Sequence, residues 1–158
     1  MSARPDGAAA RAPARDCVAT VVGGFIAGAI GVAVGHQATW FLLNLLGAAH
    51  YVIFSMRPVP PFSVPQIGSH MFWGGTWGIV LAWALTRRGS MNYWLFAGLF
   101  GLIAPTLVGW IVVPLIKGTP LFGGPPWHIQ AVRPLPNIAF TLLAALVLRL
   151  LQSGFVWR

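Results

Sequence analysis

Residues Val18–Leu46 read VATVVGGFIAGAIGVAVGHQATWFLLNLL and contain no Asp, Glu, Lys or Arg. About 20 helical residues cross the ~30 Å hydrocarbon layer of a bilayer, so this run is long enough to span a membrane. Three further segments share its apolar character: Ile67–Thr86, Met91–Ile116 and Asn137–Gln152. The sequence therefore predicts an all-α polytopic membrane protein with four transmembrane helices.

The charged residues favour the same class. After Asp16 the chain contains no Asp or Glu, 8% of all residues are charged, and the mean hydropathy is +0.76. A soluble surface carries charges of both signs, whereas an unpaired charge is costly in lipid. The composition excludes carboxylate proton relays and acid/base pairs after Asp16, and we expect a non-catalytic protein without metal or cofactor.

The chain divides into a polar cytoplasmic tail, Met1–Asp16, and a single transmembrane domain over residues 17–158. The first apolar run continues past Leu46, and Gly47 is expected to bend it so that Ala48–Ser55 forms an interfacial half-helix. A fifth span with a turn at Gly35-His36-Gln37 is the alternative. That version places Arg87 and Arg88 outside, against the tendency of Lys and Arg to remain in the cytoplasm.

Basic residues also predict the orientation. The N-terminal arginines, the Arg87–Arg88 turn and Arg158 are expected to face the cytoplasm, together with both termini. Three basic residues would then form an outer mouth in long, proline-rich connections: Arg57, Lys117 and Arg133. The expected location is the bacterial cytoplasmic (inner) membrane. Because the basic residues form no patch, we expect no nucleic-acid partner.

Two similar hairpins, residues 18–86 and 91–152, form an internal repeat in this interpretation. Phe25–Gly31 matches Leu95–Gly101, and the proline-rich segments that begin at Arg57 and Lys117 also match. Hairpins of the same orientation would be related by an axis along the membrane normal.

Small residues predict how the helices pack. Gly24, Gly28, Gly31 and Gly35 recur at steps of four and three, so they trace one seam on a helix. Such seams let backbones approach closely where lipid removes the hydrophobic drive for association. We expect this seam to receive the third helix, which carries a comparable stripe of Gly98, Gly101 and Pro105; a contact between copies of the chain is the alternative.

Pro105 lies in the middle of the third span and leaves the Gly101 carbonyl without its helical hydrogen bond. Such breaks are common as simple kinks, although they also line transporter sites. Three further polar groups are expected at membrane depth, where interhelical hydrogen bonding is the default: Gln37, Asn44 and Asn137.

Histidines are the candidate ligands for a cofactor. His50 and His70 both fall toward the outer side and could lie at matching depth, as a bis-His haem or a metal ion would require. The sequence has no CxxCH or HxxxH spacing to support such a site, and interfacial histidines usually make ordinary hydrogen bonds.

The loop from Pro114 to Trp127 is apolar, and its prolines and glycines predict an irregular path at the outer membrane face. With Phe96-Ala97-Gly98 upstream, its Pro-Leu, Gly-Thr-Pro-Leu-Phe and Pro-Trp elements resemble the YagU-like family of uncharacterised bacterial inner-membrane proteins, over Leu95–Trp127. This chain lacks the acidic residues expected near that loop in the family. The resemblance implies an inner-membrane setting and no established chemistry.

Three functional hypotheses follow. The first is a non-catalytic accessory or structural subunit of a membrane assembly, with lipid and other membrane subunits, or copies of itself, as partners. The second is a transporter or channel for a neutral or anionic solute, with the basic residues at its mouth. The third is a haem- or metal-binding electron-transfer subunit.

Overall fold

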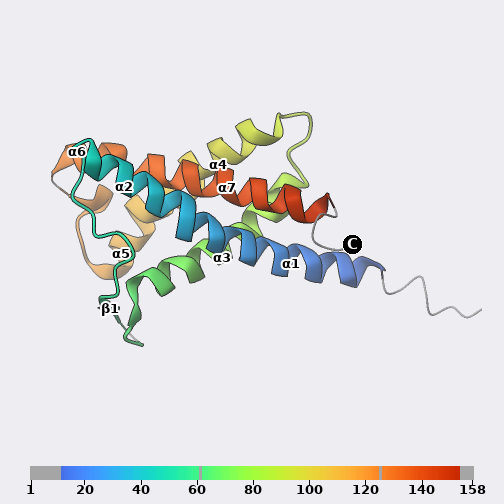
Figure 1. The fold of residues 1–158 in the computed structure, drawn as a ribbon, viewed down its shortest axis with the longest axis horizontal. Helices are drawn as coiled ribbons and strands as arrows, with labels where there is room; N and C mark the ends of the chain where they lie inside the picture. Colours follow the sequence, from blue (N-terminus) through green and yellow to red (C-terminus); the bar gives the residue numbers. More distant parts are fainter. Residues whose placement is uncertain (1–11, 61, 125, 154–158) are drawn as a thin grey trace, which may run out of the picture.

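The computed structural model describes residues 12–60, 62–124 and 126–153, and this part of the chain is predominantly helical (Figure 1). The first rod runs without interruption through α1 (Ala12–Ile30), a π-helical segment η1 (Gly31–His36) and α2 (Gln37–Leu45). A two-stranded antiparallel hairpin, β1 (Pro58–Val59) with β2 (Val64–Pro65), then leads into α3 (Gln66–Leu85).

The second half begins with another continuous rod, formed by α4 (Tyr93–Leu107), the π-helical η2 (Val108–Val112) and α5 (Val113–Lys117). A short 3₁₀ turn, η3 (Leu121–Gly123), and α6 (Trp127–Val132) precede α7 (Pro134–Gln152). The start of α1, the α3–α4 turn and the end of α7 lie at one end of the bundle (Figure 1). The β hairpin and α6 lie at the opposite end.

Three helices are long and apolar enough to cross a membrane: Cys17–Leu45, Tyr93–Lys117 and Trp127–Gln152. They correspond to the first, third and fourth predicted spans. The second, α3, has 20 residues, but its glycines and polar first turn lower its hydropathy. A crossing by α3, and with it the four-span fold, stays a prediction.

Some details of the first half differ from the prediction. Residues 1–11 of the predicted tail lie outside the described residues; α1 begins at Ala12, and its candidate span begins at Cys17, one residue before the predicted Val18. The helix continues through Gly35-His36-Gln37, which rules out the turn that a fifth span needs. Ala48–Ser55 is not a half-helix but turns and extended backbone. Gly47 does end the rod, since it adopts the left-handed region at φ 67°.

The proline-rich connection after Lys117 is also more helical than expected. It contains α6, and α7 begins at Pro134, before the predicted start at Asn137. Pro134 and Pro136 fall in the first turn of α7, where a missing backbone N–H breaks no helical hydrogen bond. The prolines therefore start this helix and do not exclude it.

The glycines of the first rod face two helices, and neither is the third span. An added Cβ at Gly24 would lie 2.7 Å from the Ile79 Cα of α3, and one at Gly28 would lie 2.8 Å from the Gly78 Cα. At Gly31 and Gly35 an added Cβ would meet the backbone of α7, at Phe140 and Ala139 respectively. The expectation that this surface receives the third helix is therefore wrong, because α3 and α7 occupy it.

Gly101 of α4 instead faces α7, where an added Cβ would meet Thr141 and Asn137. Gly98 has more room, since its nearest contact is the Leu142 side chain at 3.9 Å. The main helix pairs are thus α1 with α3 and α4 with α7. Their shared core consists of Ala27 and Val32, then Leu81, Ala82 and Leu85, then Ala97, and on α7 Phe140, Ala144, Ala145 and Leu148.

Pro105 is part of a hydrogen-bonded network between α4 and α7. The Thr106 hydroxyl donates to the Gly101 carbonyl at 2.9 Å, which is the group that Pro105 leaves without its helical donor. Asn137 Nδ2 donates in turn to Thr106 Oγ1, also at 2.9 Å. The predicted interhelical hydrogen bond of Asn137 is therefore confirmed, and it stabilises the helix at the proline.

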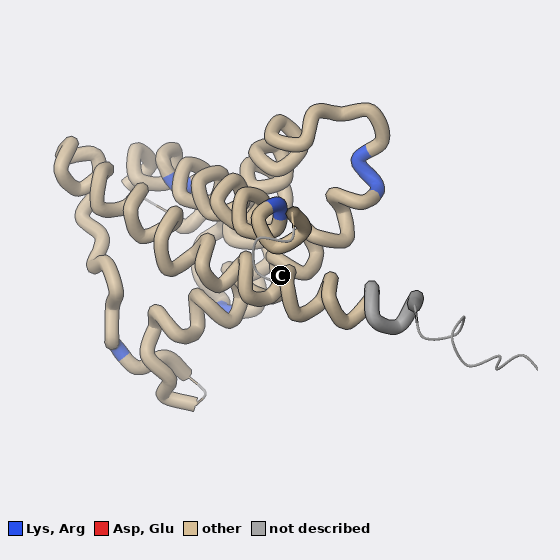
Figure 2. The backbone as a smooth tube through the Cα atoms, turned by 45° about the vertical axis from the view of Figure 1, so that its right-hand side comes forward, with Lys and Arg blue, Asp and Glu red and all other residues tan. Residues whose placement is uncertain are grey.

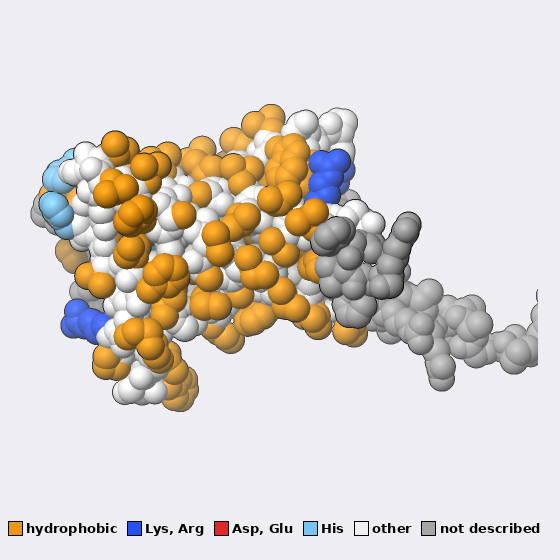
Figure 3. Space-filling model, viewed as in Figure 1, with side chains coloured by type: hydrophobic (Ala, Val, Ile, Leu, Met, Phe, Trp, Pro, Cys, Tyr) orange, Lys and Arg blue, Asp and Glu red, His pale blue; other side chains and the backbone are white. Residues whose placement is uncertain are grey.

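The outer surface separates apolar and charged residues. Hydrophobic side chains cover the middle of the face in Figure 3, and Lys, Arg and His side chains appear at its two ends. In the backbone view, adjacent Lys/Arg positions mark the turn between α3 and α4, which contains Arg87 and Arg88 (Figure 2). Such a distribution suits a protein whose middle lies in hydrocarbon.

Candidate functional site

A cluster of aromatic and histidine side chains lies at the end of the bundle opposite the Arg87–Arg88 turn. The rings of His36 and His70 are 6.0 Å apart between centroids, and Trp40 stacks on Tyr51 at 4.6 Å with an interplanar angle of 12°. His36 also makes edge contacts with Trp40 and Tyr51. The Tyr51 hydroxyl lies 3.4 Å from His70 Nδ1. We call these four residues the histidine–tyrosine cluster.

The chain folds back after Gly47 to deliver Tyr51 to this cluster. Asn44 holds the backbone of Tyr51 twice: its Nδ2 donates to the Tyr51 carbonyl at 2.7 Å, and its Oδ1 accepts from the Tyr51 N–H at 2.9 Å. One helical turn earlier on the rod lies Trp40, and Gln37 Oε1 accepts from the Phe54 N–H at 3.0 Å. We call residues 48–56 the return segment. Because these side-chain bonds use its backbone N–H and C=O groups, the segment does not form a helix.

The π-helical segment η1 ends at His36, directly before Gln37. Its wider turn changes the angular position of every residue that follows, so it contributes to aiming His36, Gln37 and Trp40 at the return segment. Segments of this kind are frequent at functional sites.

Two of the three predicted mouth residues lie near the cluster. Arg133 is close enough to Tyr51, and Lys117 to His70, for electrostatic interaction. Burial raises the pKa of the Tyr51 phenol, and the Arg133 guanidinium partly opposes this shift. Arg57 is exposed beside the β hairpin. The structure thus assembles a site with two cations, a neutral phenol and two imidazoles.

Two buried polar atoms near these residues have no hydrogen-bond partner among the described residues: Trp40 Nε1 and Gln130 Oε1. The Gln130 amide and the Arg133 guanidinium both approach Gly123, which has φ 82°. Gln130 Nε2 donates weakly to the Gly123 carbonyl at 3.4 Å. The site therefore has one unpartnered acceptor, Gln130 Oε1, near the Arg133 guanidinium, and one unpartnered donor, Trp40 Nε1, which together suit a small polar ligand.

The structure does not bring His50 and His70 together as predicted. His50 is exposed and, within the described residues, makes no hydrogen bond or ring contact, whereas His70 faces His36. No group of three or more His, Cys, Asp or Glu in the described part of the chain could hold a metal ion. The sequence reasoning missed His36 because it depends on the return of the chain at Gly47. The available signal in the sequence was Gly47, a residue type that often ends a helix, four residues before Tyr51.

Comparison with protein-family models, curated proteins and solved structures finds no match for the chain. The resemblance of Leu95–Trp127 to the YagU-like family therefore stays a prediction.

Proposed function

We propose that this protein is a small integral membrane protein with four spans and a non-catalytic role, as a helical subunit that associates with other membrane proteins or with copies of itself. One observation carries the proposal. Polar side chains within the candidate spans bond to other parts of the bundle, as in the Asn137–Thr106–Gly101 network, while the outward faces of the spans are apolar. Such a bundle presents to its surroundings a surface suited to lipid and to other helices.

The fourth span would be α3. Its 20 residues make a helix of about 30 Å, the thickness of the hydrocarbon layer. It lies along α1 through Gly74 and Gly78, and Arg87 and Arg88 follow its end. With α3 crossing, both termini lie on one side, which we propose is the cytoplasmic side of a bacterial inner membrane.

Cysteine labelling in intact cells tests this topology. Ser63 precedes α3 and Ser90 follows it, so a membrane-impermeant thiol reagent should label Ser63→Cys and miss Ser90→Cys. Both variants belong in a Cys17→Ser background, because Cys17 is exposed. Labelling of both positions, or of neither, would show that α3 does not cross.

Native mass spectrometry after extraction in mild detergent tests the assembly. We expect a particle heavier than one 16.9 kDa chain, containing either a second protein in fixed ratio or several copies of this one. A monomer without any partner, from membranes where the protein is abundant, would contradict the proposal.

A second candidate function is passage of a neutral or anionic solute, and the histidine–tyrosine cluster favours it. Lys117, Arg133 and the uncommitted Trp40 N–H supply donors at one end of the bundle without a competing carboxylate. Anion efflux from vesicles that contain the purified protein would test this function. Arg133→Gln should reduce the flux and Arg57→Gln should leave it unchanged, because Arg57 lies outside the cluster.

A further inference from the structure

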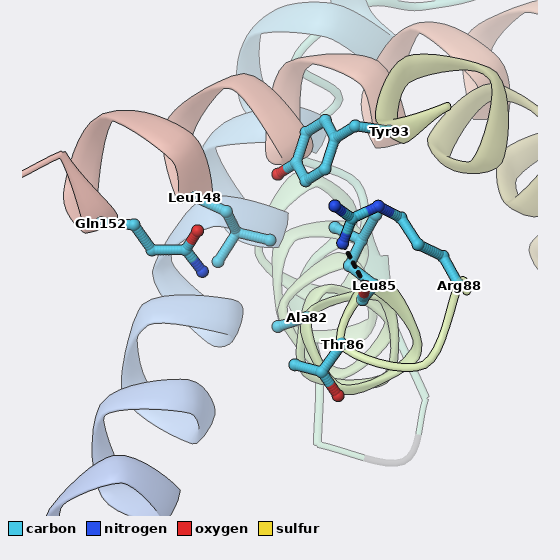
Figure 4. Close-up of a pocket in the computed structure, with 7 residues that line it drawn as sticks. All are labelled: Ala82, Leu85, Thr86, Arg88, Tyr93, Leu148 and Gln152. Carbon is cyan, nitrogen blue, oxygen red and sulfur yellow. Dashed lines mark hydrogen bonds between the residues drawn. The ribbon is translucent and has the colours of Figure 1, made fainter. Parts of the chain in front are cut away.

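A small pocket opens at the end of the bundle that carries the α3–α4 turn. Its volume is about 140 Å³, several times the roughly 30 Å³ that one water occupies in the liquid. Figure 4 shows Arg88, Tyr93 and Gln152 around this space, with Leu85 and Leu148 on its apolar wall. These residues come from the turn, α4, α7 and the end of α3. The space suits a polar group of several atoms that is joined to an apolar part.

One guanidinium group, that of Arg88, lines the pocket, and a second, that of Arg149, lies outside the lining at the Tyr93 ring. Arg88 is 5.4 Å and Arg149 is 5.6 Å from the centre of the Tyr93 ring. That ring is fixed, since the Tyr93 hydroxyl donates to the Ala145 carbonyl at 2.8 Å. Arg88 donates to the Leu85 carbonyl, but a guanidinium carries five N–H donors, so most of its donors stay available.

These positive charges have no internal counter-charge in the described part of the chain. No Asp or Glu follows Asp16 in the sequence, and neither guanidinium is paired with a carboxylate among the described side chains. The Gln152 amide also makes no hydrogen bond there. An anion in the pocket would therefore meet donors that no other group occupies.

The position of the pocket along the membrane normal indicates which class of anion it binds. Tyr93 begins one candidate span and Gln152 ends another, so the pocket lies at the level of the lipid headgroups. Trp94 lies beside Arg149, as expected for an aromatic belt at that level. Basic pockets between spans bind the headgroups of anionic lipids, and the planar guanidinium matches a phosphate in two-pronged hydrogen bonding.

We propose that this pocket binds the phosphate of an anionic phospholipid, with Arg88 donating to the phosphate oxygens and the Gln152 amide to the headgroup, while Arg149 beside the Tyr93 ring adds a second positive charge. The acyl chains extend from the phosphate into the hydrocarbon layer. Inorganic phosphate offers the same oxygens without the chains, so the two sources of phosphate can be separated by experiment.

Native mass spectrometry of the full chain in mild detergent measures the binding of phosphatidylglycerol, phosphatidylcholine and inorganic phosphate. Wild-type protein should bind phosphatidylglycerol at least about tenfold more tightly than phosphatidylcholine. Arg88→Gln should weaken phosphatidylglycerol binding about fivefold to tenfold, because it removes charge-assisted hydrogen bonds. The matched control is Arg87→Gln, which removes the same charge one residue away. Arg87 packs over Trp83 outside the pocket, so we expect less than about a twofold change.

A second pair of variants adds charge without removing a contact. Gln152→Glu places a carboxylate in the pocket and should weaken phosphatidylglycerol binding about tenfold. Ser90→Glu adds the same charge in the turn outside it and should have little effect. Equal losses within either pair, or equal binding of both lipids by the wild type, would overturn the proposal. Binding of inorganic phosphate with the same variant pattern, without phosphatidylglycerol binding, would reassign the pocket to free phosphate.

Discussion

In the α1–α3 hairpin, backbone meets backbone: an added Cβ at Gly28 would contact the Gly74 carbonyl, and one at Gly78 would contact the Gly24 carbonyl. In the α4–α7 hairpin, the Gly101 carbonyl lies beneath side chains, where Thr106 and Asn137 complete a hydrogen-bonded network. The first contact depends on the absence of side chains alone, whereas the second combines the close approach at Gly101 with particular polar side chains. The two proposed repeats thus hold similar helices together by different physical means, and different substitutions should break them.

The largest effect is expected for Gly28→Leu in the first hairpin. The new side chain would meet the Gly74 carbonyl and the Gly78 Cα, and backbone atoms cannot move aside without separating the helices. The free energy of unfolding in detergent should fall by about 3 kcal/mol. Gly68→Leu is the control, because an added Cβ at Gly68 has nothing within 4 Å, and its stability should stay close to wild type. Equal stability of the two variants would show that the close backbone contact at Gly28 does not hold α1 and α3 together.

The second hairpin should be most sensitive to Thr106→Val. This substitution keeps the shape but leaves the Gly101 carbonyl and the Asn137 amide without their buried partner, at a cost of about 2 kcal/mol. The matched control is Thr76→Val on α3, because the exposed Thr76 hydroxyl bonds within its own helix. The same detergent unfolding experiment compares the two. If Thr76→Val lowers the free energy of unfolding as much as Thr106→Val does, the network between α4 and α7 contributes no more than a hydrogen bond within one helix.

The return segment of the first hairpin should respond to Asn44→Leu. Both hydrogen bonds to the Tyr51 backbone are lost, and we expect a destabilisation of about 1 kcal/mol. The change should be local, with faster amide hydrogen exchange in residues 48–56 and unchanged exchange in α4 and α7. Faster exchange throughout the bundle would mean that this segment is part of the central packing.

The smallest effect concerns the Tyr51 phenol. Its pKa is raised in the folded protein, so the neutral form is favoured there. The resulting stability is fully present below the pKa of an ordinary tyrosine, about 10, and is lost as the pH rises toward the higher folded value. The unfolding free energy of the wild type should fall between pH 9 and 11 by more than that of Tyr51→Phe. Parallel curves would show that burial of this phenol has no energetic consequence.

The sequence predicted the helical class and three candidate spans well, because apolar runs and proline-rich connections depend on local composition. It also predicted the interhelical hydrogen bond of Asn137, since a lone amide in lipid needs a partner. It did not predict which helices meet. Gly31 and Gly35 contact α7 because of how the whole bundle is arranged, and spacing along one helix cannot specify its neighbour.

The candidate site was less predictable. Lys117 and Arg133 were identified from charge alone, but the pairing of His36 with His70 depends on the direction the chain takes after Gly47. That direction is set by two hydrogen bonds: Asn44 Nδ2 donates to the Tyr51 carbonyl, and Gln37 Oε1 accepts from the Phe54 N–H. Contacts of this kind leave no periodic pattern in the sequence, so they cannot be predicted from it and are seen only in the structure.

The π-helical segment Gly31–His36 divides one straight rod into two angular registers. A π turn accommodates an extra residue, and each residue of an α-helix advances the direction of its side chain by about 100°. The register of α1 is fixed by Gly24 and Gly28 against α3, while that of α2 is fixed by Trp40 and Asn44 against the return segment. Loss of a single residue in between would leave both halves helical yet turn one set of contacts away from its partners. The number of residues in this segment therefore sets the angle between the contacts of α1 and those of α2.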